Sequence, residues 1–324
     1  MCRDGARMED IDPKNDLAVI TCADRNMLAA GCCTLLSARD NLGKSASFHL
    51  VALDISDRDR AAVEKFCALR NLTIHIHPFE SALLPKLSKG RWSPAALTRL
   101  FLDQIGLPNF RRMLYLDADT LVVRSMSALA HLDLHGNIAA AVDDYIVPFP
   151  KKIATRRDKL GLGPDSSYFN SGVILFDWQS CLKSDLLGQA RQNVENRHSA
   201  YHALDQDALN AALDGKWARL HPKWNAQTGF LPDIRDPIIV HFTGRRKPWQ
   251  NGAAWVHREY SRKYAEYLAG TDWPGFCANT AISGKLAKYA LHLGKKLEGL
   301  PKAGKIRAFL KASNDARIWR GDDI

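Results

Sequence analysis

Four apolar or aromatic residues, 113–116, deliver two carboxylates to the end of a predicted β-strand, in the segment Asp117-Ala118-Asp119. The run is short and continuously apolar, which is typical of a strand buried on both faces. Side chains two positions apart on a strand point to the same side, so we expect Asp117 and Asp119 to face one space. Two such charges repel unless a cation lies between them, and a divalent ion fits that need. The alternative for so short a motif is a polar turn after a core strand.

Strands and helices alternate along the chain before this segment. Short apolar runs predict strands over residues 17–22, 48–53 and 72–77, and amphipathic or capped segments predict helices over 26–39, 56–69 and 93–105. This order predicts an α/β fold with a mostly parallel central sheet, right-handed crossovers and flanking helices. Ligands of such sheets lie at the carboxyl ends of the strands, where Asp24, Asp117 and Asp119 all fall.

The second half of the chain has shorter predicted strands, over 138–142, 173–176 and 238–240, with helices over 178–197 and 205–213. Helical and increasingly basic patterns follow over 253–268, 282–297 and 305–311. We therefore expect one α/β domain over residues 16–250 and a basic helical extension over 251–324, with an indistinct boundary between them.

The apolar runs and the cysteines bear on where the protein works. No run reaches the roughly 20 apolar residues of a membrane span, and the N-terminal residues lack the apolar core of a signal peptide. The seven cysteines form no C-x-x-C pair and no zinc-type spacing with histidine, so we expect them to be reduced. These features predict a cytoplasmic protein.

Positive charge is concentrated near the C-terminus. The formal net charge is +10, and residues 283–324 hold ten Lys or Arg against four Asp or Glu, a net charge of +6. Over 282–319 the chain also sets apolar residues on one helical stripe and adds Phe309 and Trp319. These features predict peripheral contact with an anionic membrane, and no nucleic-acid-binding module is present to favour nucleic acid. A helix packed on the main domain is the alternative.

Four further segments place polar groups at the ends of predicted elements. They are ADRN at 23–26, FNSGV at 169–173, DQDALN at 205–210 and HFTGRRKPW at 241–249. Together with LYLDAD at 114–119 and in this order, they resemble the retaining family-8 glycosyltransferases, the group that contains glycogenin and bacterial lipooligosaccharide galactosyl- and glucosyltransferases. The resemblance covers residues 16–249. It implies a nucleotide-sugar-binding fold of GT-A type, a UDP-sugar donor, Mn²⁺ as cofactor with Mg²⁺ as the alternative, and retention of anomeric configuration.

The resemblance also implies roles for single residues. Asp117, Asp119 and His241 match the metal ligands, and two carboxylates with one imidazole suit Mn²⁺ better than Mg²⁺ or Ca²⁺. A hydrogen-bonded histidine at a strand end is the alternative for His241. The nucleotide and its diphosphate are expected at the two aspartates and at Ala23, Asp24, Asn26, Arg99, Ala118, Gly244 and Lys247.

Asn170, Asp205 and Gln206 match positions that line the donor sugar and the reaction centre, and with Lys247 they are the predicted catalytic residues. An amide such as that of Gln206 is a poor nucleophile, so a two-carboxylate double displacement is not expected. We expect a front-side route instead, in which UDP leaves as the acceptor hydroxyl arrives on the same face.

Asp143, Asp144 and Tyr145 follow a predicted strand and are candidates for binding acceptor sugar hydroxyls. Five basic residues within 151–159, together with Arg245-Arg246, favour an anionic acceptor, with a solvated basic face as the alternative.

The leading hypothesis is a hexosyltransferase that moves glucose or galactose from a UDP-sugar to a glycan acceptor of the lipopolysaccharide or lipooligosaccharide core. One alternative is a sugar nucleotidyltransferase, which needs a glycine-rich basic loop where 23–26 stands. The other is a non-catalytic membrane- or glycan-binding protein on the same fold.

Overall fold

The computed structural model describes residues 16–42, 46–84, 94–197, 201–244, 246–250, 257–273, 302–315 and 317–321. Five features considered above lie outside these residues. They are the N-terminal residues 1–15, Ser93 at the start of the helix predicted over 93–105, Arg245, the start of the helix predicted over 253–268, and the whole of the helix predicted over 282–297.

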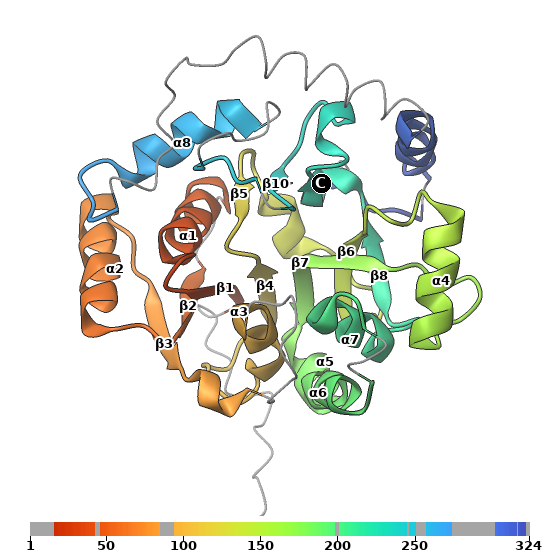
Figure 1. Cartoon of the computed structure of the whole chain (residues 1–324), viewed down its shortest axis with the longest axis horizontal. Helices are drawn as coiled ribbons and strands as arrows, with labels where there is room; N and C mark the ends of the chain where they lie inside the picture. Colours follow the sequence, from red (N-terminus) through yellow and green to blue (C-terminus); the bar gives the residue numbers. More distant parts are fainter. Residues whose placement is uncertain are drawn as a thin grey trace, which may run out of the picture.

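A seven-stranded sheet forms the centre of the molecule, in the order β3-β2-β1-β4-β7-β6-β8 (Figure 1). Its strands are β1 (Leu17–Asp24), β2 (Ser47–Leu53), β3 (His75–Phe79), β4 (Arg112–Leu116), β6 (Ala139–Asp143), β7 (Phe169–Asp177) and β8 (Trp217–Leu220). All neighbouring pairs are parallel except those made by β7, which runs antiparallel to β4 and β6. The predicted mostly parallel sheet is confirmed.

Helices cover both faces of this sheet. One apolar core contains residues of α1 (Leu28–Leu42), α2 (Asp57–Arg70) and α8 (Arg258–Leu268). The other contains residues of α3 (Pro94–Thr98), α4 (Pro150–Leu160), α5 (Trp178–Lys183), α6 (Leu186–Arg197) and α7 (Leu204–Ala212). Along β1, Leu17 and Val19 enter the first core while Ala18 and Ile20 enter the second. The strand is continuously apolar because both of its faces are covered.

A second sheet of three very short strands brings distant segments together. Its order is β5 (Thr120–Val122), β10 (Ile239–His241), β9 (Ala226–Gln227). In the antiparallel pair of β5 and β10, His241 lies opposite Thr120, and the backbone N–H of Phe242 donates to the carbonyl of Asp119 at 3.0 Å. This small sheet therefore fixes the chain after the two aspartates against the end of β10.

Several predicted boundaries differ from the structure. The helix predicted over 178–197 is divided into α5 and α6 at Asp185, whose φ of 50° is incompatible with a continuous helix. The helix predicted over 93–105 is α3 followed by a 3₁₀ turn, Arg99–Phe101. Strand β3 begins later than predicted and contains Pro78, which is tolerated because β3 lies at the sheet edge. The other 3₁₀ turns are Ser81–Leu83, Ser127–His131, Pro222–Asn225 and Leu231–Asp233.

The beginning of the predicted extension packs on the main fold. Helix α8 lies over α1 (Figure 1). On α8, the side chain of Tyr264 is 0% exposed and packs against the rings of Phe242 and Trp249. Residues 302–312 form a further helix. Within the described part of the chain, no helix combines the length and the apolar character needed to span a membrane.

We predict that Tyr264→Ala lowers the free energy of unfolding by about 3–5 kcal/mol, because it removes a fully buried ring and leaves a cavity. Tyr264→Phe keeps the ring and should cost about 1 kcal/mol or less. Denaturant titration measures both losses, and Arg262→Ala, an exposed position on the same helix, is the control. A loss for Tyr264→Ala no larger than that of the control would show that α8 does not belong to the cooperative core.

Candidate functional site

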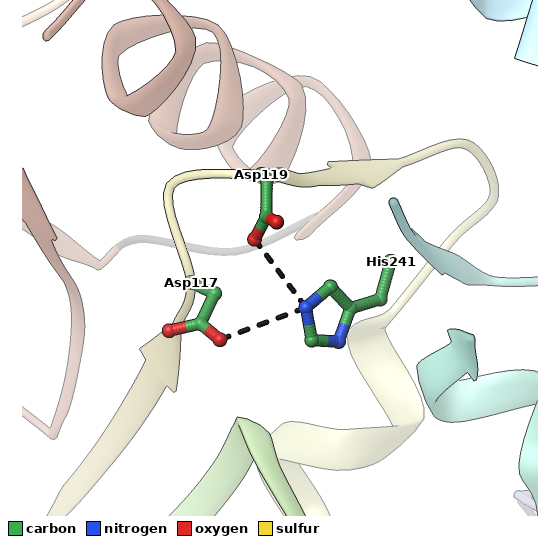
Figure 2. A group of neighbouring side chains, drawn as sticks. All are labelled: Asp117, Asp119 and His241. Carbon is green, nitrogen blue, oxygen red and sulfur yellow. Dashed lines mark ion pairs between the residues drawn. The ribbon is translucent and has the colours of Figure 1, made fainter. Parts of the chain in front are cut away.

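Two carboxylates and one imidazole converge where β4 ends and β10 ends. Asp117, Asp119 and His241 each offer a ligand atom, and these atoms lie within 4.8 Å of one another. The Nε2 atom of His241 is 3.6 Å from Asp117 Oδ2 and 3.3 Å from Asp119 Oδ1. Figure 2 shows the imidazole pointing between the two aspartates. The structure thus brings together the three residues predicted to bind metal.

The hydrogen bonds of His241 fix which ring nitrogen carries the proton. Nδ1 is 3.0 Å from Asn225 Oδ1, and Asn225 Nδ2 donates to Asn170 Oδ1 at 2.9 Å. Asn170 Oδ1 also accepts the backbone N–H of Gly172 at 3.1 Å, so both amides have one consistent orientation. Nδ1 is therefore the protonated nitrogen, and the lone pair of Nε2 faces two carboxylate oxygens. Three electron-pair donors that converge in this way fit a bound cation.

Cationic side chains occupy the other oxygens of the two aspartates. Arg99 Nη2 is 2.6 Å from Asp117 Oδ1, and the Tyr115 hydroxyl donates to the same oxygen at 3.0 Å. Lys247 Nζ donates to Asp119 Oδ2 and, at 2.7 Å, to the carbonyl of Phe242. Only Asp117 Oδ2 and Asp119 Oδ1 are therefore left to face His241. Burial opposes ionisation of Asp119, but the ammonium group of Lys247 beside it helps to hold the pKa of this carboxyl below its usual range.

A close approach of backbone to the cluster requires a glycine in β7. A Cβ atom on Gly172 would lie 2.1 Å from Cε1 of His241 and 2.8 Å from Asp117 Oδ2. The Gly172 carbonyl in turn accepts the backbone N–H of Asp117 at 2.8 Å. The glycine of the FNSGV segment thus makes room for the imidazole while its backbone holds the aspartate loop.

The predicted catalytic residues form a second polar group beside the cluster. Gln206 Oε1 accepts from the Ser171 backbone N–H at 3.0 Å and from Asn170 Nδ2 at 3.2 Å. Gln206 Nε2 donates to Asp144 Oδ2 at 3.1 Å and to the Tyr168 hydroxyl at 3.0 Å. Both lone pairs and both protons of the Gln206 amide are therefore engaged within the protein.

Asp205 lies at the boundary between the two groups. Its Oδ2 is 3.1 Å from Nε of Arg99, the same guanidinium that binds Asp117. Burial raises the pKa of Asp205, and Arg99 counteracts that effect. Arg99 is 6% exposed, so its charge acts inside the site rather than in solvent.

Of the acceptor candidates, Asp144 belongs to this arrangement, because its Oδ2 also accepts from Asn170 Nδ2 at 3.1 Å. Asp143 is 4% exposed and is bound by Ser167 and, at 3.3 Å, by Arg219. Burial raises the pKa of Asp143 despite that arginine. The ring of Tyr145 packs against Phe149 and Phe230.

Of the predicted nucleotide-binding residues, Arg99 lies in the 3₁₀ turn after α3 and the others lie at or after the ends of β1, β4 and β10. Asp24 Oδ1 accepts the backbone N–H groups of Asn26 and Met27, which holds the turn into α1. Ala23 and Ala118 both lie next to Gly31 of α1, so the end of β1 adjoins the aspartate loop. Gly244 follows β10 with a φ of 92°, a conformation that glycine adopts without strain.

Two parts of the site were not predicted. Asn225, in a 3₁₀ turn, orients His241, and Asp207 accepts from the Tyr168 hydroxyl at 2.5 Å. The basic residues within 151–159 lie on helix α4, and Arg156 Nη1 donates to Asp207 Oδ1 at 2.6 Å. Arg156 thus contributes to the network around Gln206, which corrects its expected place facing an acceptor.

We predict that Gly172→Ala weakens the binding of divalent cations by at least about 10- to 100-fold, because the new methyl group displaces the imidazole of His241. Isothermal titration with Mn²⁺ measures the affinity, and thermal unfolding shows whether the variant is folded. Gly304→Ala is the matched control, since a Cβ there meets nothing within 4 Å. Unchanged affinity in folded Gly172→Ala would contradict a cation site at these three residues.

Comparisons with known proteins identify the family of the chain. The family model described as "Glycosyl transferase family 8" matches residues 18–253. General stress protein A of Bacillus subtilis is 27% identical over 282 residues, covering 79% of this chain and 94% of that protein. Lipopolysaccharide 1,2-glucosyltransferase of Escherichia coli is 27% identical over 283 residues and 82% of each chain.

A solved structure supports the fold. The galactosyltransferase LgtC, crystallised with donor and acceptor sugar analogues, superposes with a TM-score of 0.68 at 23% identity, over 77% of this chain and 95% of that one. The predicted GT-A type fold is confirmed. Because the family model matches well over half of the sequence, the chain belongs to glycosyl transferase family 8, the retaining family that its motifs predicted.

Proposed function

We propose that this glycosyltransferase moves a hexose, glucose or galactose, from a UDP-sugar to a glycan acceptor in a Mn²⁺-dependent reaction with retention. The observation that carries the proposal is the direction of the His241 Nε2 lone pair, which faces Asp117 Oδ2 and Asp119 Oδ1. Membership of the family supports a nucleotide-sugar donor and a glycan acceptor.

Asp117, Asp119 and His241 would hold the metal ion. Two oxygens and one nitrogen suit Mn²⁺, with Mg²⁺ as the alternative. When bound, the ion would neutralise charge on the diphosphate of the leaving UDP. Lys247 lies against Asp119 and adds a second positive charge on the same side.

Binding of the donor is assigned to residues around this cluster. The nucleotide would contact Ala23, Asp24, Asn26, Ala118 and Gly244, which lie at the ends of β1, β4 and β10. The hydroxyls of the donor sugar would bind Asp205 and Asn170. Asp205 is paired with Arg99, and this pairing favours its ionised form, which accepts strong hydrogen bonds.

The hydrogen bonds of Gln206 support a front-side mechanism. Its carboxamide oxygen already accepts from Ser171 and Asn170, so an attack on the donor sugar would break both bonds. The carboxamide of Gln206 would therefore be a fixed polar group near the reacting carbon and not a nucleophile. The acceptor hydroxyl would approach on the face from which UDP leaves, and the departing phosphate would take its proton.

The names of relatives suggest the class of acceptor. The Escherichia coli relative is named as a lipopolysaccharide glucosyltransferase, and LgtC as a galactosyltransferase. We propose an acceptor sugar of a lipopolysaccharide or lipooligosaccharide core, bound beside Asp144 and Tyr145. Residues 16–250 would form the catalytic domain. Of the segment 282–319 predicted to contact a membrane, Phe309 and Trp319 pack on the protein, so the candidate for contact with anionic lipid is narrowed to the basic sequence of 282–297.

We predict that the protein hydrolyses UDP-glucose or UDP-galactose slowly in the presence of Mn²⁺ and that EDTA abolishes this activity. His241→Ala should lower the rate by about 100-fold or more and weaken Mn²⁺ binding, because it removes one of three ligands. UDP release and Mn²⁺ titration provide the two readouts. His135→Ala, an exposed position, is the control. Hydrolysis that persists in EDTA would refute the metal-dependent reaction.

We predict that Gln206→Ala lowers kcat by about 100- to 1,000-fold, the range found when one polar group that stabilises a transition state is removed. Removal of a covalent nucleophile costs far more, on the order of 10⁶-fold in a well-studied serine protease. Steady-state kinetics with the better of the two UDP-sugars distinguishes these cases. Complete loss of activity in a variant that still binds UDP and Mn²⁺ would contradict the front-side route.

A further inference from the structure

The described part of the C-terminal segment, 302–315 and 317–321, returns to the catalytic fold (Figure 1). In the helix over 302–312, the ring of Phe309 stacks on that of Phe230, with centroids 5.4 Å apart and planes inclined by 16°. Arg307 Nε lies 3.4 Å from Asp233 Oδ1, in the 3₁₀ turn that follows Phe230. The helix is therefore attached to this turn by both a ring contact and an ion pair.

A second attachment lies at the edge of the main sheet. The Trp319 backbone N–H donates to the carbonyl of Arg219 at 3.1 Å, and its carbonyl accepts the N–H of His221 at 2.9 Å. Its indole stacks on the buried Trp224 at 5.1 Å. The backbone at Trp319 thus pairs with β8 and covers the edge of that strand.

The first attachment leads directly to the acceptor side of the site. Phe230 also packs against Tyr145, at a centroid distance of 5.5 Å. A Cβ atom on Gly229 would lie 2.2 Å from Cε2 of Tyr145, so the ring lies directly against the backbone there. The Tyr145 N–H donates to Gln227 Oε1 at 2.9 Å. Three rings therefore form a row from the C-terminal helix to the residue that follows Asp144.

We propose that Phe309 is a positioning residue for the acceptor and that it acts through Phe230 on the ring of Tyr145. The inference rests on the proposed function, in which Tyr145 contacts the acceptor. Tyr145 is partly exposed, and an aromatic ring held at a fixed angle presents an apolar face suited to a hexose ring. The C-terminal segment would then form part of the acceptor wall, and its loss would lower the use of acceptor more than the use of donor.

The test measures how the full-length enzyme partitions the donor sugar between acceptor and water. UDP-glucose or UDP-galactose is supplied with Mn²⁺ and either lactose or cellobiose, and the ratio of transfer to hydrolysis is determined. This ratio does not depend on the amount of folded enzyme, so partial unfolding of a variant leaves it unchanged. Donor KM is measured in parallel.

Phe309→Ala should lower the partition ratio by about 3- to 10-fold, as expected for the loss of one ring contact. Donor KM and the rate of hydrolysis should stay within about 2-fold of wild type. Phe309→Tyr keeps the ring and should restore the ratio. Lys305→Ala, exposed on the same helix, is the matched control. Tyr145→Ala should lower the ratio too, and adding Phe309→Ala to it should have no further effect.

An unchanged ratio in Phe309→Ala, or a further fall in the double variant, would overturn the proposal. A parallel loss of hydrolysis and transfer would also overturn it, because it would indicate general loosening of the site. Wild-type enzyme that hydrolyses the donor but transfers to neither sugar would refute a hexose site at Tyr145. Absence of hydrolysis in wild type would refute the proposed function itself and, with it, this inference.

Discussion

Electrostatic repulsion between Asp117 and Asp119 is the constraint around which the site is built. Two like charges about 4 Å apart repel by roughly 4 kcal/mol at an effective dielectric constant of about 20. Arg99 and Lys247 each neutralise one carboxylate oxygen, and they leave the other oxygen of each pair directed at His241. The two cations thus stabilise the loop without occupying the space between the aspartates. A mobile divalent ion can then enter and leave a site that is already formed.

The polar residues behind this cluster connect the candidate cation site to the residues proposed to bind the acceptor. Asn170 uses its carbonyl oxygen to hold Asn225, and so His241, while its amide nitrogen serves Asp144 and Gln206. Every group in this network is buried or partly buried. If one side chain rotated, another would therefore lose its hydrogen-bond partner. The same amide network therefore orients His241 toward the two aspartates and holds the carboxamide of Gln206 in place.

The elements that the sequence predicted correctly are those with a local pattern. Continuous apolar strands and capped helices identified the sheet, and the short motifs identified Asp117, Asp119 and His241, which the fold brings together. Strands β5 and β9 have only three and two residues, too few for a periodic signal, and each forms by pairing with β10, which the sequence predicted over 238–240. The role of Asn225 could not be predicted, since its partners His241 and Asn170 are 16 and 55 positions away in the sequence.

The C-terminal segment shows why an amphipathic basic sequence pattern is compatible with two structures. A helix with apolar rings and lysines can lie on a lipid surface or pack on the protein, and the sequence pattern alone does not distinguish the two. In the structure, Phe309 and Trp319 are stacked on Phe230 and Trp224, so these rings are not available to enter a membrane. Lys302, Lys305 and Lys311 remain exposed on the same helix. Any attraction to anionic lipid by this helix would therefore act through its lysines, and it would leave Phe309 and Trp319 stacked on the rest of the protein.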